Sequence, residues 1–127
     1  MRMEHVAIYM SDIEKGREFF ERYFGGKSNQ KYSNKNTGFS SYFISFTDGS
    51  RLELMTNTSL HEGHKIDNQT GYSHIAFSVG SKEKVMELTE QIRMDGYRVL
   101  SNPRTTGDGY FESCVADLEG NRIEITI

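Results

Sequence analysis

The last residues of the chain alternate strictly between apolar and polar side chains after a turn at Gly120 and Asn121. Isoleucines occupy every second position from 123 to 127, so they share one face of a predicted strand, and Glu124 lies on the other face. Residues 48–55 repeat this pattern, with a turn, two leucines on one face and Glu53 on the other. The pattern therefore predicts two related strands that each carry one carboxylate opposite an aliphatic row.

A second pair of segments repeats at nearly the same offset. Residues 3–9 and 72–78 align at His5 and His74, and in both segments the aliphatic side chains fall on the face opposite the histidine. Four predicted strands thus each hold one side chain that can bind a metal, on the face that is not aliphatic. In chain order they are His5, Glu53, His74 and Glu124.

A helix is predicted after the first strand of each copy. Ser11 to Glu14 has the spacing of a capping box, and Gly25 follows the helix as a residue that tolerates a left-handed conformation. In the second copy Ser81 is the expected N-cap and Gly96 the expected stop. The predicted buried positions of the two helices are Ile13, Phe20, Tyr23 and Phe24, then Val85, Leu88 and Ile92.

The remaining segments complete a β-α-β-β-β order in each copy. The first copy has a polar edge strand at 28–34 and an aromatic strand at 39–46, and the second has strands at 97–102 and 110–116 with a loop at 103–109. The predicted class is α+β, with two βαβββ modules forming a curved mixed sheet around a metal site. We expect one domain over 1–127, made of module 1 (about 1–56), a linker (57–71) and module 2 (72–127).

The linker is polar, has no hydrophobic period and holds two further histidines, His61 and His64. Their spacing would suit a metal pair. Without an apolar scaffold to fix them, they are more often ordinary loop histidines, so they are not placed in the site.

Composition excludes several classes of function. The net charge of −3 comes without a basic stripe, which argues against nucleic-acid binding, and no apolar run is long enough to span a membrane. The N-terminal residues lead into a strand without the apolar stretch of a signal peptide. The single cysteine, Cys114, fits a reducing, cytoplasmic location and is expected to be a small core residue rather than a nucleophile.

Two imidazoles and two carboxylates without a thiolate form a donor set suited to a divalent cation. Such a set leaves room for six-coordination with open positions for substrate, unlike the closed tetrahedron of a structural zinc. The site residues thus predict a metal ion that takes part in binding or chemistry.

The whole chain resembles the vicinal oxygen chelate superfamily, which includes glyoxalase I, extradiol dioxygenases and bleomycin-resistance proteins. The resemblance rests on His5-Val-Ala-Ile, His74-Ile-Ala-Phe-Ser-Val and the ending Asp117-Leu-Glu-Gly-Asn-Arg-Ile-Glu, which is similar to the family's Asp-Pro-Asp-Gly-Asn-x-Ile-Glu. It implies paired βαβββ modules around one metal ion. The family's ligand positions coincide with the four side chains identified above.

Within the superfamily, a His/Glu/His/Glu set of metal ligands resembles the ligand set of glyoxalase I. This implies a lyase or isomerase acting on a small 2-oxoaldehyde–thiol hemithioacetal by enediolate proton transfer, with one divalent ion (Ni, Zn, Co, Fe or Mn) per site. Glu124 is the expected base and Glu53 the alternative. The expected substrate-binding residues are Tyr9, Tyr72 and Arg122.

Other readings stay open at this point. The resemblance also fits a dioxygenase, a thiol transferase, an antibiotic-resistance protein, an epimerase or a non-enzymatic protein that sequesters a ligand. Glyoxalase I has an arginine four residues after the first histidine that holds the carboxylate of glutathione, and this chain has Tyr9 there. The resemblance implies a homodimer for a chain of this size. No nucleic acid or membrane is expected as a partner.

Overall fold

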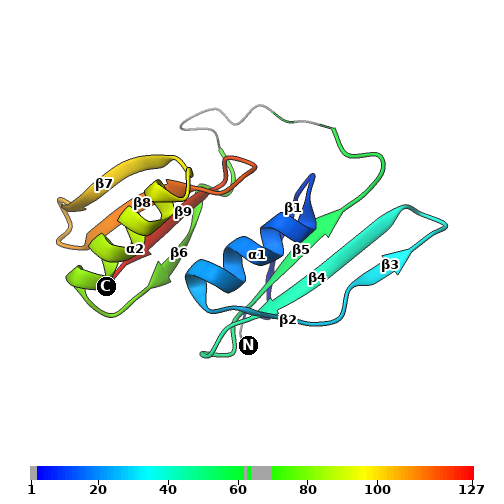
Figure 1. Ribbon diagram of the computed structural model, residues 1–127, viewed down its shortest axis with the longest axis horizontal. Helices are drawn as coiled ribbons and strands as arrows, with labels where there is room; N and C mark the ends of the chain where they lie inside the picture. Colours follow the sequence, from blue (N-terminus) through cyan, green and yellow to red (C-terminus); the bar gives the residue numbers. More distant parts are fainter. Residues whose placement is uncertain (1–2, 62, 64–69) are drawn as a thin grey trace. The chain divides into compact units, whose positions relative to one another are not determined.

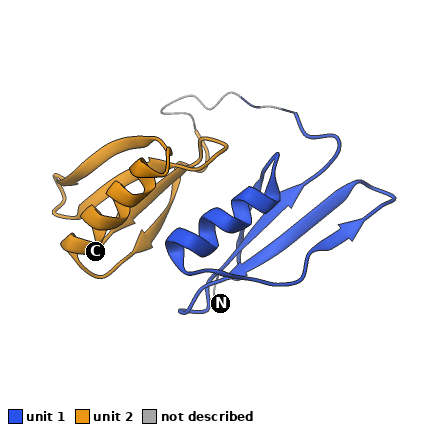
Figure 2. Ribbon diagram, in the orientation of Figure 1, with its two compact units in different colours: residues 1–63 blue, residues 64–127 orange. Residues whose placement is uncertain are grey.

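The computed structural model describes residues 3–61, 63 and 70–127. It divides into two compact units, Met1–Gly63 and His64–Ile127 (Figure 2). Each unit consists of one sheet and one helix (Figure 1). The prediction of an α+β protein built from two similar units with mixed sheets is confirmed.

The first unit has a sheet in the order β1-β5-β4-β2, with β3 also paired to β4. β1 and β5 run parallel, whereas β4 is antiparallel to β5, β2 and β3. The polar segment predicted as one edge strand is divided in two, because its register with the long β4 shifts by one residue between Ser28 and Tyr32. The elements are β1 (Val6–Tyr9), α1 (Ile13–Phe24), β2 (Lys27–Ser28), β3 (Tyr32–Asn34), β4 (Phe39–Ser45) and β5 (Arg51–Thr56).

The second unit has a four-stranded sheet in the order β6-β9-β8-β7, with β6 and β9 parallel and the other pairs antiparallel. Its first and last strands therefore pair in the same way as β1 and β5 of the first unit. The elements are β6 (His74–Ser78), α2 (Lys82–Met94), β7 (Val99–Thr105), β8 (Phe111–Ala116) and β9 (Arg122–Thr126).

Each helix covers one face of its own sheet. Leu52 and Leu54 of β5 are buried, and a methyl group added at Gly16 of α1 would touch Leu54. In the second unit Ile123 and Ile125 are fully buried. Because side chains alternate along a strand, the intervening Glu53 and Glu124 lie on the sheet faces that the helices leave uncovered.

The buried stripe of α2 differs from the predicted one by one position. Val85 and Ile92 are fully buried as expected, but Leu88 is only half-buried and Thr89 takes the core position. The Thr89 hydroxyl can be buried because it donates to the Val85 carbonyl and lies 2.6 Å from the Ser113 hydroxyl of β8. These internal bonds could not be read from the hydrophobic pattern.

The N-terminal cap of α1 is Asp12 and not the predicted Ser11. The Asp12 carboxylate accepts a hydrogen bond from the Lys15 amide at 3.0 Å, and the helix begins at Ile13. The capping box fails because Glu14 points away from the cap toward β4. The other predicted helix ends are confirmed: Ser81 caps α2, and Gly25 after α1 is left-handed with φ of 65°.

Pro103 lies inside β7, where a loop was predicted. The strand continues to Thr105 at the edge of the sheet, and its register with β8 shifts between Ser101 and Arg104. An edge strand with such an irregularity tolerates a residue that has no amide hydrogen. The predicted loop therefore begins after Thr105.

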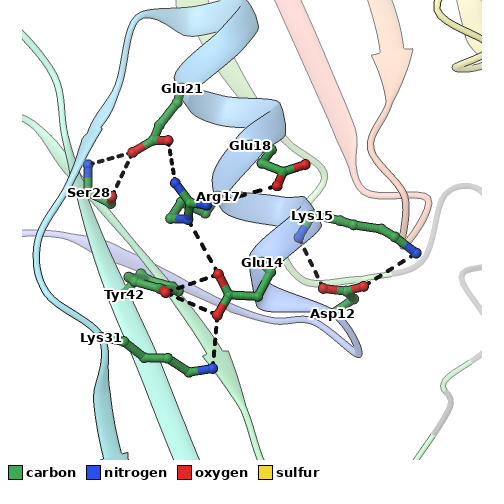
Figure 3. Close-up of polar contacts among 9 residues, drawn as sticks. All are labelled: Asp12, Glu14, Lys15, Arg17, Glu18, Glu21, Ser28, Lys31 and Tyr42. Carbon is green, nitrogen blue, oxygen red and sulfur yellow. Dashed lines mark hydrogen bonds and ion pairs between the residues drawn. The ribbon is translucent and has the colours of Figure 1, made fainter.

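A polar cluster fastens α1 to the strands beside it (Figure 3). Glu14 accepts hydrogen bonds from the Tyr42 hydroxyl (3.0 Å) and Lys31 (2.9 Å), and Glu21 accepts from the Ser28 hydroxyl (2.6 Å). The hydrogen bond from Lys31, followed by that from Tyr42, lowers the pKa of Glu14 below its ordinary value of 4.5. The bonds to Ser28 lower the pKa of Glu21 in the same way.

Acidification is expected to destabilise the protein through this cluster, and Tyr42→Phe should weaken that dependence. A lowered carboxyl pKa in the folded state means that the unfolded chain binds more protons, so the stabilisation is present above about pH 4.5 and is lost as the pH falls further. Losing the Tyr42 hydroxyl should cost about 1 kcal/mol at pH 7 and less at pH 3.5. Urea unfolding at both pH values tests this, with Tyr32→Phe on the exposed edge as the control. An equal loss at both values would contradict the coupling to Glu14.

Candidate metal centre

The parallel pairing of β1 with β5 brings His5 and Glu53 together. The register sets Ala7 opposite Glu53, and His5 is two residues before Ala7 on the same side. The Nε2 atom of His5 lies 3.7 Å from Oε2 of Glu53, and both side chains are partly shielded from solvent. The first unit thus contains the first predicted ligand pair.

The second unit repeats this arrangement with the same register. Ala76 lies opposite Glu124, and His74 is two residues before Ala76. The Nε2 atom of His74 lies 3.1 Å from Oε2 of Glu124. In both units the residue opposite the glutamate is an alanine, two positions after the histidine. No bulky side chain therefore separates the imidazole from the carboxylate on that face.

The other ring nitrogen of each histidine has a partner in the preceding residue. Nδ1 of His5 contacts the Glu4 carboxylate, and Nδ1 of His74 lies 3.3 Å from the Ser73 hydroxyl. Nε2 of each histidine faces the glutamate of its own unit, and with the hydrogen on Nδ1 its lone pair would be directed at that carboxylate. A nitrogen lone pair facing a carboxylate is stabilised by a cation between them.

Among the described residues, no group of three or more His, Cys, Asp or Glu is arranged to hold a metal ion. The four predicted ligands come together as two pairs, one in each unit. Of the linker histidines, His61 lies in irregular structure and His64 lies outside the described residues. The donor atoms of the two pairs, imidazole nitrogen and carboxylate oxygen, match those that divalent cations use.

The three predicted substrate-binding residues lie in different settings. Tyr9 ends β1 on the same side as Ala7 and is 54% exposed. Arg122 lies opposite His74 in the register of β6 and β9, on the face of Glu124. Tyr72 precedes β6 and its side chain is fully exposed, so the strand itself does not fix its direction.

Cys114 is a buried residue that also neighbours the second pair. It is 7% exposed, as expected for a small core residue, and it lies directly opposite Glu124 in the register of β8 and β9. Burial raises the pKa of the Cys114 thiol, so it is protonated at neutral pH. This supports the prediction that Cys114 is not a nucleophile, but its place beside Glu124 was not foreseen.

The sequence reasoning also missed Glu4. This residue contacts His5 and pairs with Arg51 of β5. The sequence contained one difference between the two copies that could have drawn attention to it. The acidic residue Glu4 precedes His5, whereas Ser73 precedes His74. The pairing with Arg51 depends on a contact across 47 positions of the chain and could not be read locally.

A family model matches residues 2–125 and carries the description Glyoxalase/Bleomycin resistance protein/Dioxygenase superfamily. The chain belongs to this superfamily. The resemblance drawn from the histidine motifs and the C-terminal motif is thereby confirmed. The match runs through both units, so it includes all four predicted ligands.

Two proteins illustrate how the chain relates to other members of the superfamily. It is 29% identical to the uncharacterized protein YqjT of Bacillus subtilis (strain 168), covering 97% of this chain and 96% of that one. It is 26% identical to the lactoylglutathione lyase of Escherichia coli O157:H7, covering 98% of this chain and 91% of that protein.

Among solved structures, glyoxalase I from Zea mays superposes with a TM-score of 0.80 at 22% identity and shows that the fold is shared. The superposition covers 98% of this chain, which spans only 44% of the maize chain. In the part of the chain that the structure describes, neither helix has the length and apolar character needed to cross a bilayer.

Proposed function

We propose that this member of the superfamily is a divalent-metal-dependent lyase or isomerase of the glyoxalase I type. Its substrate would be the hemithioacetal of a small 2-oxoaldehyde and a thiol. The main support is the repeated pair: the same histidine and glutamate, in the same strand register, on the uncovered face of both sheets. The similarity to a lactoylglutathione lyase of comparable length supports the same reading.

The proposed ligands are His5, Glu53, His74 and Glu124, with the two pairs sharing one ion. A bound divalent ion would supply a Lewis acid that stabilises negative charge developing on two adjacent substrate oxygens. The two imidazoles would hold the ion, and neither needs to leave it. The metal could be Ni, Zn, Co, Fe or Mn, since nitrogen and oxygen donors accept all of these.

Glu124 is the proposed base, and Glu53 is the alternative. A carboxylate oxygen of Glu124 would remove the proton from one carbon of the substrate and return it to the neighbouring carbon. Arg122 lies on the same face of β9 and would stabilise Glu124 as a carboxylate while it is away from the metal. General acid–base catalysis of this kind contributes typically about 10²–10⁴-fold.

Three side chains are proposed to contact the thiol half of the substrate. Tyr9 stands on the site face of β1 and, with Tyr72 and Arg122, is proposed to contact the substrate. A tyrosine cannot form the ion pair that an arginine forms with a carboxylate. The thiol therefore need not be glutathione, and other low-molecular-weight thiols are equally suitable candidates.

We further propose that the protein acts as a homodimer in the cytoplasm. The chain spans less than half of the maize glyoxalase I chain, so two copies supply about the amount of structure that one maize chain contains. A reducing compartment suits the single cysteine.

Turnover of methylglyoxal is expected to require both a divalent metal and a thiol. The protein would be stripped with a chelator, reloaded separately with Ni, Zn, Co, Mn or Fe(II), and assayed with glutathione and a panel of other thiols. Activity should be lost on stripping and return with at least one metal and one thiol. The chelated protein, assayed with the same thiols, is the control.

Three results would contradict the proposal in different ways. A protein that binds no metal would be a ligand-sequestering member of the superfamily. A protein that binds metal and consumes oxygen with a catechol would be a dioxygenase. Metal binding with thiol addition to an epoxide, and no methylglyoxal turnover, would indicate a thiol transferase.

A further inference from the structure

His5 differs from His74 in how the backbone holds it. β6 begins at His74, which pairs in register with Arg122 of β9, whereas β1 begins at Val6 and leaves His5 outside the strand. A residue just before a strand lacks the ladder that fixes its neighbours. His5 therefore needs support from side chains to keep its Nε2 directed at Glu53.

The structure supplies that support through Glu4. One carboxylate oxygen of Glu4 contacts Nδ1 of His5, and the other pairs with the Arg51 guanidinium of β5. Both oxygens are thus engaged, and Glu4 joins the segment before β1 to the strand that carries Glu53. The side chain of Glu4 is half exposed, so it does not owe its position to burial.

Phe43 completes the set of contacts. The Arg51 guanidinium lies 4.3 Å from the centre of the Phe43 ring, and the His5 ring meets the same ring edge-on with centroids 5.2 Å apart. Phe43 is opposite Glu53 in the register of β4 and β5. The contacts among Glu4, Arg51, Phe43 and His5 therefore form a closed cycle that restricts both the tilt and the rotation of the imidazole.

We propose that Glu4 is a positioning residue, which holds His5 as the Nδ1–H tautomer and thereby presents the Nε2 lone pair toward Glu53. The expected benefit to metal binding rests on the proposed function. The tautomer of His5 does not, because it is a property of the metal-free protein. Carboxylate partners of metal-binding histidines typically contribute about 10–100-fold to metal affinity. The second unit uses the Ser73 hydroxyl and the strand ladder instead, so it should depend less on its partner.

The first experiment reads the tautomer directly. Imidazole ¹⁵N chemical shifts would be measured in the metal-free protein at about pH 8, where histidines are mostly neutral. Glu4→Ala should convert His5 from the Nδ1–H form to a mixture of tautomers while leaving His74 unchanged. Glu4→Gln should largely preserve the Nδ1–H form, because the amide oxygen still accepts its hydrogen bond. Ser73→Ala is the matched control and should leave His5 unchanged.

The second experiment measures zinc affinity by competition with a chromogenic chelator. Glu4→Ala should weaken binding by about 10–100-fold, Glu4→Gln by less, and Ser73→Ala by less than about threefold. Thermal unfolding of each variant would show whether the fold is kept. The partial rescue by glutamine separates positioning from a general loss of structure.

The inference is overturned if Glu4→Ala leaves the His5 tautomer unchanged, or if Glu4→Ala and Ser73→Ala weaken zinc binding equally. Failure of the proposed function gives a different result: the parent would bind no zinc, while the tautomer of His5 would still respond to Glu4. If Glu4→Ala does not fold, the zinc affinity of Glu4→Gln decides, since parental affinity in that variant together with an unfolded alanine variant would mean a purely structural role.

Discussion

Glu124→Gln is expected to lower turnover by at least about 10²-fold while the protein still binds its metal. Glutamine has the same size and keeps one oxygen that can contact a cation, but its amide cannot accept the proton from carbon. Since Ile123 and Ile125 on either side are fully buried, the strand should keep its place. The change therefore removes the base and little else.

Turnover would be measured with the metal and thiol that support the parent, and bound metal would be measured on the same sample. Glu112→Gln is the matched control, because Glu112 is a partly buried glutamate on the neighbouring β8 that pairs with Arg104 at 3.6 Å. It should keep most of the activity. If Glu53→Gln is inactive while Glu124→Gln keeps near-parental turnover, the roles of the two glutamates are exchanged. If neither substitution matters, this site does not transfer protons.

The strand faces could be predicted from the sequence because burial and alternation are local signals. Leu52, Leu54, Ile123 and Ile125 lie on the covered faces, which by the period of two places both glutamates on the uncovered ones. The internal repeat added information on how strands of the two units correspond, which no single strand contains. It related the His5 strand to the His74 strand, and the structure pairs each histidine with the glutamate of its own unit.

The errors concern features that depend on tertiary contacts. Ser11 and Asp12 are both residue types that cap helices well, and Asp12 is the N-cap in the structure. A capping box from Ser11 would need the Glu14 side chain, which instead accepts hydrogen bonds from Tyr42 and Lys31. Pro103 continues an edge strand because a register shift accommodates it. Glu4 acquires its partner only when β5 brings Arg51 beside it. None of these depends on hydrophobic period or spacing.

We propose that the two pairs share one metal site. Each pair offers one nitrogen and one carboxylate, and two ligands alone hold a divalent ion weakly. Sharing one ion between pairs would give four ligands with open positions for substrate. The pairs can belong to one chain or to two.

His5→Ala and His74→Ala are each expected to lose most metal affinity and all measurable turnover, and a mixture of the two proteins should regain activity. In a dimer whose sites join the first unit of one subunit to the second unit of the other, a mixed dimer has one site lacking both histidines. Its other site keeps His5, Glu53, His74 and Glu124. Half of the dimers are mixed after random exchange, so about a quarter of all sites should be intact.

The two variants would be mixed in equal amounts under conditions that allow subunit exchange, reloaded with metal and assayed for turnover and bound metal. Recovery to about a quarter of the parental activity would support sites shared between subunits. His61→Ala, which changes a histidine in the irregular segment after β5, is the control and should keep parental metal content. No recovery after proven exchange would place each site within one chain, and a monomer by light scattering would reject the dimer. Parental metal affinity in His74→Ala would reject the four-ligand site, because removing one of two imidazoles from such a site cannot leave its affinity unchanged.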